Sequence, residues 1–150
     1  MDLLQELRDI EEIKKLKARY CYYVDEGRWD ELMELWTEDA VAEYGPWGTY
    51  SGKESLGKFF REFVPTFVPF ITHMVHNPLI SVDGDSASGQ WYFECAGTVA
   101  PANRAVWIMG RYDETYQRAT NDWKFKSLKV SFKYFTPYDE GWVKTPMMTG

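Results

Sequence analysis

The residues FITHMVHNP, numbers 70–78, stand where the pattern of the chain changes from helical to strand-like. They hold both histidines of the protein, His73 and His76, within an apolar run. Histidine is the one side chain whose ordinary pKa lies near physiological pH, so we expect any proton chemistry to centre here. Side chains on a strand alternate between its two faces, so residues three apart point to opposite sides. Only one of the two histidines can therefore face an interior pocket, and spacing alone does not decide which.

A meander of four strands is predicted from this point onward, at 70–82 with a bend at Asn77-Pro78, 87–99, 105–118 and 123–135. Residues 83–85 contain the Asp-Gly pair that is typical of a hairpin turn. The C-terminal tail, 136–150, is rich in proline, methionine and aromatic residues. We expect it to cover the sheet or to reach a neighbouring subunit.

Three helices are predicted before these strands, at 3–25, 29–36 and 51–64, with short strands at 40–44 and 49–50 around a turn. Apolar residues recur every three or four positions in the first helix, which is typical of one buried face. Most of its charged residues, Lys17 among them, are expected on the other face, and Gly27 just past its end. Ser51 and Glu54 have the spacing of a capping box at the start of the third helix.

This order of elements indicates an α+β fold, in which helices pack on one face of a curved, mainly antiparallel sheet. A bent sheet wrapped over a long helix makes a cone-shaped α+β barrel with an apolar interior pocket. The length of 150 residues fits a single domain over 1–150. Aromatic residues make up 17% of the chain, enough to line such a pocket as well as to fill a core.

The composition also limits the partners and the location of the protein. A net charge of −6 without a Lys/Arg cluster argues against a nucleic-acid or an anionic membrane partner. No apolar run approaches the ~20 residues of a membrane span, and the acidic N-terminus is unlike a signal peptide, so we expect a cytoplasmic protein. The two thiols, Cys21 and Cys95, are not expected to form a disulfide. A large aromatic sheet with one exposed face favours a homo-oligomer, a dimer or a trimer.

Several motifs together resemble the SnoaL-like branch of the nuclear-transport-factor-2-like superfamily, over residues ~8 to 135. These motifs are 13–20, Asp25, 29–40, 72–78, 89–92, 110–116 and 123–125. Within that branch the chain resembles the dehydratases that act on bile acids and on scytalone, and the hexachlorocyclohexane dehydrochlorinases. The resemblance implies elimination of water or HCl from a cyclic substrate without a cofactor. One fold hosts many functions, so the reaction is implied less strongly than the fold.

The resemblance places a His–Asp pair on His73 and Asp25, with a helix tyrosine at Tyr20. His73 would take a proton, Asp25 would fix its tautomer, and Tyr20 would donate to a carbonyl or leaving group. Further substrate contacts are expected from the following residues: Tyr44, Trp91, Phe93, Cys95 and Lys133.

The sequence departs from the family pattern at two points. Cys95, or its neighbour Glu94, stands where the bile-acid enzyme has a second aspartate. Lys133 or Lys129 stands where relatives use an arginine on the last strand. These departures leave the substrate and the leaving group open.

Taken together, the sequence predicts a cofactor-independent lyase or isomerase that acts on a cyclic, largely apolar small molecule such as a steroid, terpenoid or polyketide. No metal is expected, because His-x-x-His on a flat strand is a poor zinc pair and has no further ligand at suitable spacing. Two alternatives stay open. One is a non-catalytic cone that binds a ligand, and the other is a structural subunit resembling the small β subunit of aromatic-ring dioxygenases.

Overall fold

The computed structural model describes residues 2–148 as a long helix and a group of short helices on one face of a six-stranded sheet. The helical segments are α1 (Leu3–Glu26), α2 (Trp29–Met33), the 3₁₀ turn η1 (Gly45–Trp47), α3 (Lys53–Lys58), the π-helical turn η2 (Phe59–Phe63) and α4 (Val64–Phe67). The strands are β1 (Trp36–Glu43), β2 (Thr49–Ser51), β3 (Phe70–Asp83), β4 (Ser86–Val99), β5 (Arg104–Ala119) and β6 (Asp122–Pro137). The predicted α+β class is confirmed.

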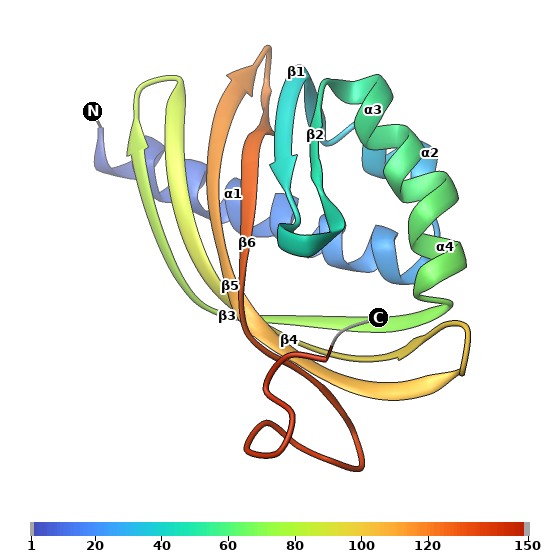
Figure 1. Ribbon diagram of the computed structural model, residues 1–150. Coiled ribbons are helices and arrows are strands. Elements are labelled where there is room, and N and C mark those ends of the chain that lie inside the picture. The colour runs from blue at the N-terminus through green and yellow to red at the C-terminus, as the bar shows by residue number, and fades with distance from the viewer. Residues whose placement is uncertain (1, 149–150) are drawn as a thin grey trace.

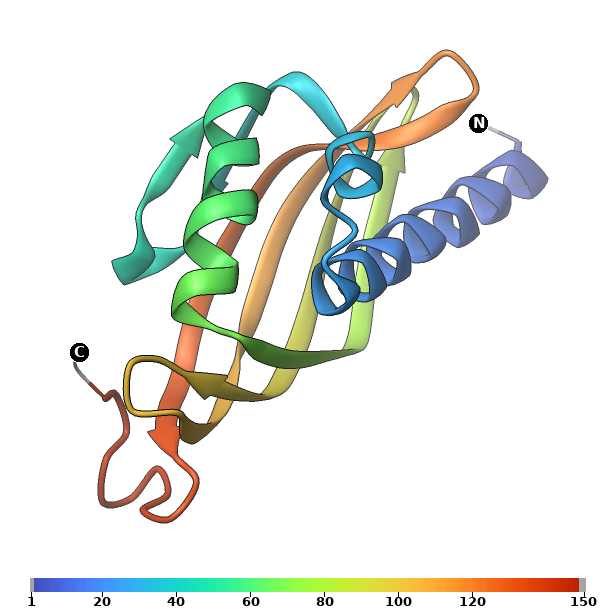
Figure 2. The ribbon, with the colours of Figure 1, turned by 90° about the vertical axis from the view of Figure 1, so that its right-hand side faces the viewer.

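The sheet has the strand order β2-β1-β6-β5-β4-β3. Strands β3 to β6 form the predicted antiparallel meander, whereas β1 pairs with β6 in parallel. The predicted bend in β3 is a register shift between His76 and Leu79, where Asn77 has a left-handed φ of 56°. Figure 1 shows the long strands curving around α1. Figure 2 shows α1 and the segment from α3 to α4 over the same face of the sheet.

Helix α1 forms as its periodicity predicts. Ile13, Leu16, Tyr20 and Val24 are buried against the sheet, and Gly27 ends the helix with a left-handed φ of 67°. The prediction for Lys17 is wrong, because its side chain has no exposed surface. No helix within residues 2–148 is long and apolar enough to cross a membrane.

Three local predictions before β3 are corrected. The second helix ends at Met33, and Trp36 instead begins β1 and is buried in the core. The capping box is absent, because Gly52, with φ of 87°, occupies the cap position while Ser51 belongs to β2. The third helix continues past residue 64, because the π-helical turn η2 and α4 follow α3 without a break and carry the helical run through Pro65 to Phe67.

The described part of the tail folds back on the sheet. Tyr138 packs on Trp107, with ring centroids 5.7 Å apart, and Trp142 stacks on Tyr134 at 5.0 Å. The amide of Met148 then donates to the carbonyl oxygen of Phe135 at 2.8 Å. The expectation that the tail covers the sheet is therefore confirmed for residues up to 148, although β6 extends to Pro137. Residues 149 and 150 lie outside the described part.

Candidate active site

A histidine and an aspartate meet between the end of α1 and the first part of β3. The Nδ1 atom of His73 lies 2.6 Å from Oδ1 of Asp25. The other carboxylate oxygen, Oδ2, accepts the backbone N–H of His73 at 2.9 Å. The side chains of His73 and Asp25 are only 8% and 19% exposed. Because one carboxylate holds both the ring and the backbone of the same residue, the orientation of the imidazole is fixed.

This contact determines which ring nitrogen is available. A carboxylate at Nδ1 accepts the imidazole proton there and leaves the lone pair on Nε2. His73 lines an apolar cavity beneath α1, while its own Nδ1 is occupied by Asp25. The second histidine lies on the opposite face, as strand alternation requires, where the Nε2 atom of His76 lies 3.4 Å from Glu94 near solvent. The structure therefore gives His73 the interior position.

The cavity is small and almost entirely apolar. Its volume is about 50 Å³, below the ~150 Å³ of an engineered cavity that binds benzene. A cyclic ligand would therefore have to displace some of the lining side chains. Among the described residues, none of those lining the cavity is a lysine or an arginine. The lining residues that carry a polar side-chain atom are Tyr20, Tyr44, Trp47, His73, Cys95 and Tyr112.

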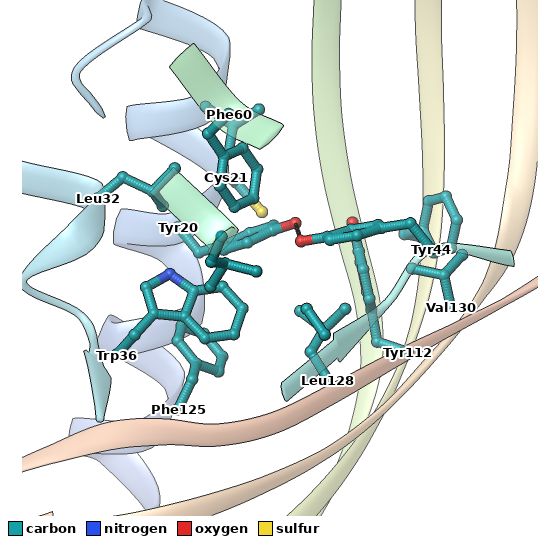
Figure 3. Close-up of a cluster of buried hydrophobic side chains, with 14 of the residues drawn as sticks. Tyr20, Cys21, Leu32, Trp36, Tyr44, Phe60, Tyr112, Phe125, Leu128 and Val130 are labelled. Atoms are coloured by element: carbon teal, nitrogen blue, oxygen red, sulfur yellow. Dashed lines mark hydrogen bonds between the residues drawn. The ribbon is translucent and has the colours of Figure 1, made fainter. Parts of the chain in front are cut away.

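Two tyrosine hydroxyls meet at the wall of this cavity. The hydroxyl groups of Tyr20 and Tyr44 lie 2.7 Å apart, and Figure 3 shows them pointing toward one another. The ring of Tyr20 also meets the ring of His73 edge-on, with centroids 6.3 Å apart. Burial raises the pKa of Tyr20, Tyr44 and Tyr112 above the ordinary value of 10.0. All three therefore stay protonated. One of Tyr20 and Tyr44 donates to the other, which leaves one O–H of that pair and the O–H of Tyr112 as hydrogen-bond donors.

Two of the predicted substrate contacts on β4, Phe93 and Cys95, also line the cavity. Burial raises the pKa of the Cys95 thiol well above its ordinary value, so the group is a thiol rather than a nucleophilic thiolate. Glu94 points to the other face, toward His76. Of the two candidates for the position of a second aspartate, only Cys95 faces the cavity.

The remaining predicted contacts are placed elsewhere. Trp91 is buried but lies outside the cavity lining, where its Nε1 donates to the hydroxyl of Tyr116 at 3.0 Å. Lys133 and Lys129 are exposed on the outer face, and the Nζ of Lys133 lies 5.0 Å from the ring centroid of Tyr92. The reason is strand alternation, because Val130 and Phe132 take the inward positions of β6. Neither lysine supplies a basic group to the cavity.

Sequence reasoning missed Tyr112 and the buried pair of Lys17 and Glu114. A usable signal was present in the spacing. Tyr112, Glu114 and Tyr116 alternate on β5 and so share its inner face. Lys17 stands four residues after Ile13 and three before Tyr20, which places it on the apolar face of α1.

A metal centre has no support in the geometry. Within residues 2–148, no group of three or more His, Cys, Asp or Glu side chains could hold a metal ion. The candidate site therefore consists of one oriented imidazole, its carboxylate partner and phenol donors around an apolar cavity.

Comparison with known proteins supplies relatives of the whole domain. The chain is 29% identical over 120 residues to an uncharacterized protein of Mycobacterium tuberculosis, covering 79% of this chain and 82% of the relative. It is 25% identical over 126 residues to the gamma-hexachlorocyclohexane dehydrochlorinase of Sphingobium indicum, covering 83% of this chain and 81% of that enzyme. The crystal structure of a type 2 hexachlorocyclohexane dehydrochlorinase superposes with a TM-score of 0.83 at 26% identity, covering 87% and 89% of the two chains.

The family model of the SnoaL-like domain matches residues 5–129, which include nearly all of α1, the short helices and most of the sheet. This range contains Tyr20, Asp25 and His73, and the fold agrees with that of the solved relative. The chain therefore belongs to the SnoaL-like family.

Proposed function

We propose that the protein is a cofactor-independent lyase that removes a hydrogen halide or water from a cyclic, largely apolar small molecule. The observation that carries this proposal is the His73–Asp25 pair, held at 2.6 Å beside an apolar cavity. Relatives that are dehydrochlorinases support an elimination in general terms. They do not identify the substrate.

In the proposed reaction, Nε2 of His73 removes a proton from a ring carbon of the substrate. The electrons of that C–H bond form a carbon–carbon double bond, and the leaving group departs with its own bonding electrons. Asp25 stabilises the imidazolium that forms, because its carboxylate already accepts from Nδ1. Tyr20, Tyr44 or Tyr112 donates a hydrogen bond to the leaving halide or hydroxide, where negative charge develops.

The lining of the cavity favours a neutral substrate. A charged ligand would lose its hydration without meeting an opposite charge, since no lysine or arginine among the described residues faces this space. The phenol hydroxyls and the imidazole can satisfy one or two polar groups, while aromatic rings contact the rest. A steroid, terpenoid or polyketide ring, or a halogenated cyclohexane, has this character.

A non-catalytic binding cone would use the same cavity. It would have no need of an oriented imidazole with a free ring nitrogen, and this feature favours the lyase. The two functions differ in one measurable respect, since a binding protein leaves its ligand unchanged.

The test is turnover of two probe substrates, gamma-hexachlorocyclohexane by chloride release and a cyclic β-hydroxyketone by the absorbance of the enone formed. His73→Ala should lower kcat by a factor of about 10² to 10⁴, the usual contribution of a general base. Asp25→Asn should lower it by a similar factor, because the amide no longer fixes the tautomer. His76→Ala is the matched control and should change kcat less than about twofold, since it lies on the outer face. Full turnover in both His73→Ala and Asp25→Asn, or a larger loss in His76→Ala, would overturn the assignment.

A further inference from the structure

A buried ion pair lies directly behind the cavity. Lys17 of α1 and Glu114 of β5 have no exposed side-chain surface, and Nζ lies 2.5 Å from Oε2. Lysine and glutamate are almost never fully buried unless they are paired. The proposed elimination uses neither residue, so the pair needs a separate explanation.

The ammonium group of Lys17 is surrounded by aromatic rings. An ammonium has three N–H donors, and Glu114 accepts one of them. The faces of two rings lie close to the same nitrogen, with the Tyr112 centroid at 3.3 Å and the Tyr20 centroid at 4.1 Å. These are cation–π distances, and both rings line the cavity. The charge therefore contacts the back of two phenols whose hydroxyls serve the candidate site.

Glu114 is held in turn by a chain of hydrogen bonds. Its Oε1 accepts the hydroxyl of Tyr116 at 2.6 Å, and that hydroxyl accepts Nε1 of Trp91 at 3.0 Å. Both carboxylate oxygens are thus occupied, one by Lys17 and one by Tyr116. These hydrogen bonds also give Trp91 a role, because Trp91 helps to hold the ion pair through Tyr116 and does not line the cavity.

Stability alone does not account for such a pair. Removing two charges from water costs so much that an apolar replacement of similar volume is often as stable or more stable. The position of the charge is more informative. Lys17 is the cation whose ring contacts reach the cavity lining, and no lysine or arginine of the described chain lines the cavity itself.

We propose that Lys17, held by Glu114, is a positioning residue that orients the phenols of Tyr20 and Tyr112 and strengthens their O–H groups as donors to the departing atom. A positive charge against the face of a phenol ring draws electron density from the ring and polarises its hydroxyl. The inference rests on the proposed elimination, in which negative charge develops on the leaving group beside these hydroxyls. Lys17 itself does not touch the substrate.

The test removes both charges together, as Lys17→Met with Glu114→Gln. Lys17→Met alone would leave a buried unpaired carboxylate and could prevent folding. Glutamine can still accept a hydrogen bond from the Tyr116 hydroxyl, so the hydrogen bonds that join residue 114 to Tyr116 and Trp91 are kept. The matched control is Asp9→Asn with Arg118→Met, because that pair also joins α1 to β5, at 2.8 Å, and is not part of the cavity lining.

Two readouts separate this inference from the proposed function. The first is kcat against KM for the probe substrates. The double variant should lower kcat about 30-fold, equivalent to about 2 kcal/mol, with KM changed less than about threefold. The second is the carbonyl stretching frequency of 2-cyclohexenone bound in the cavity, which needs no turnover. The wild-type band should lie below that of the ketone in an apolar solvent, and the double variant should lose at least half of this shift.

The outcomes are distinct. If neither probe substrate is turned over but the carbonyl shift depends on Lys17 and Glu114, the polarising role stands and the elimination proposal fails. If the double variant keeps both kcat and the carbonyl frequency of the wild type, the polarising role is wrong while the His73–Asp25 assignment is untouched. An unshifted wild-type band, or an equal loss in the Asp9/Arg118 control, would also overturn the inference.

Discussion

At the scale of single residues, the site depends on how Asp25 uses its two oxygens. One accepts from the ring of His73 and the other from its backbone, so a single carboxylate fixes both the position and the tautomer of the imidazole. Sequence reasoning identified the pair only through a family resemblance, because nothing in the spacing of residues 25 and 73 shows that they meet. The choice of His73 over His76 came from the same resemblance, since spacing alone left it open, and it is His73 that contacts Asp25 of α1.

The wall of the cavity depends on a glycine. A Cβ atom at Gly110 would lie 2.4 Å from the carbonyl oxygen of Ser131 and 2.9 Å from the ring of Phe93. We predict that Gly110→Ala destabilises the fold by about 1–3 kcal/mol, the usual cost of overpacking. Urea unfolding measures the change. Gly57→Ala is the control, since its Cβ would meet the flexible end of Arg61 at 3.1 Å in a helix and should stay within about 1 kcal/mol of wild type. Equal stability of the two variants would contradict this account of the cavity wall.

At the scale of elements, α1 is tied to the sheet by three polar contacts spaced eight residues apart, through Asp9, Lys17 and Asp25. Eight residues correspond to about 12 Å of helix. The middle contact shows why the pattern of α1 was misread. Lys17 has the helical spacing of a buried residue but a charged side chain, and its partner lies 97 positions away in the sequence. The charged side chain of Lys17 predicted a position on the solvent-facing side of α1, whereas its spacing predicted the side that packs on the sheet.

The contact at Asp9 predicts a dependence of stability on pH. The hydrogen bond from Arg118 lowers the pKa of the Asp9 carboxyl below its ordinary value of 3.8. A group whose pKa is lower in the folded state stabilises the protein above its unfolded pKa, and this contribution disappears as pH falls through the folded pKa. We predict that Asp9→Asn lowers the free energy of unfolding at pH 7 and that the difference from wild type shrinks below about pH 4. A difference that stays constant from pH 7 to pH 3, measured by urea unfolding, would show that the carboxylate charge is unimportant.

At the scale of the whole molecule, local patterns predicted most of the fold. The periodicity of α1, the Asp-Gly turn and the alternation of β4 to β6 act within short stretches, so sequence alone reveals them. The parallel pairing of β1 with β6 depends on contacts between distant segments and was not foreseen. The same holds for Trp36, which has helical spacing from the preceding helix but packs in the core against Tyr20 and Phe125.

The expected homo-oligomer stays a prediction. It is supported by Met74 and Leu79, which are 51% and 70% exposed on β3 at the edge of the sheet.

The most direct test of the central claim is the ¹⁵N NMR spectrum of the histidine rings, recorded near pH 9, about 2.5 units above the ordinary histidine pKa. The protein has two histidines, so His76→Ala assigns the spectrum. We predict that neutral His73 carries its proton on Nδ1, with Nε2 unprotonated, and that Asp25→Asn disturbs this tautomer. A proton on Nε2 of wild-type His73 would remove the lone pair that the elimination needs and would contradict the account.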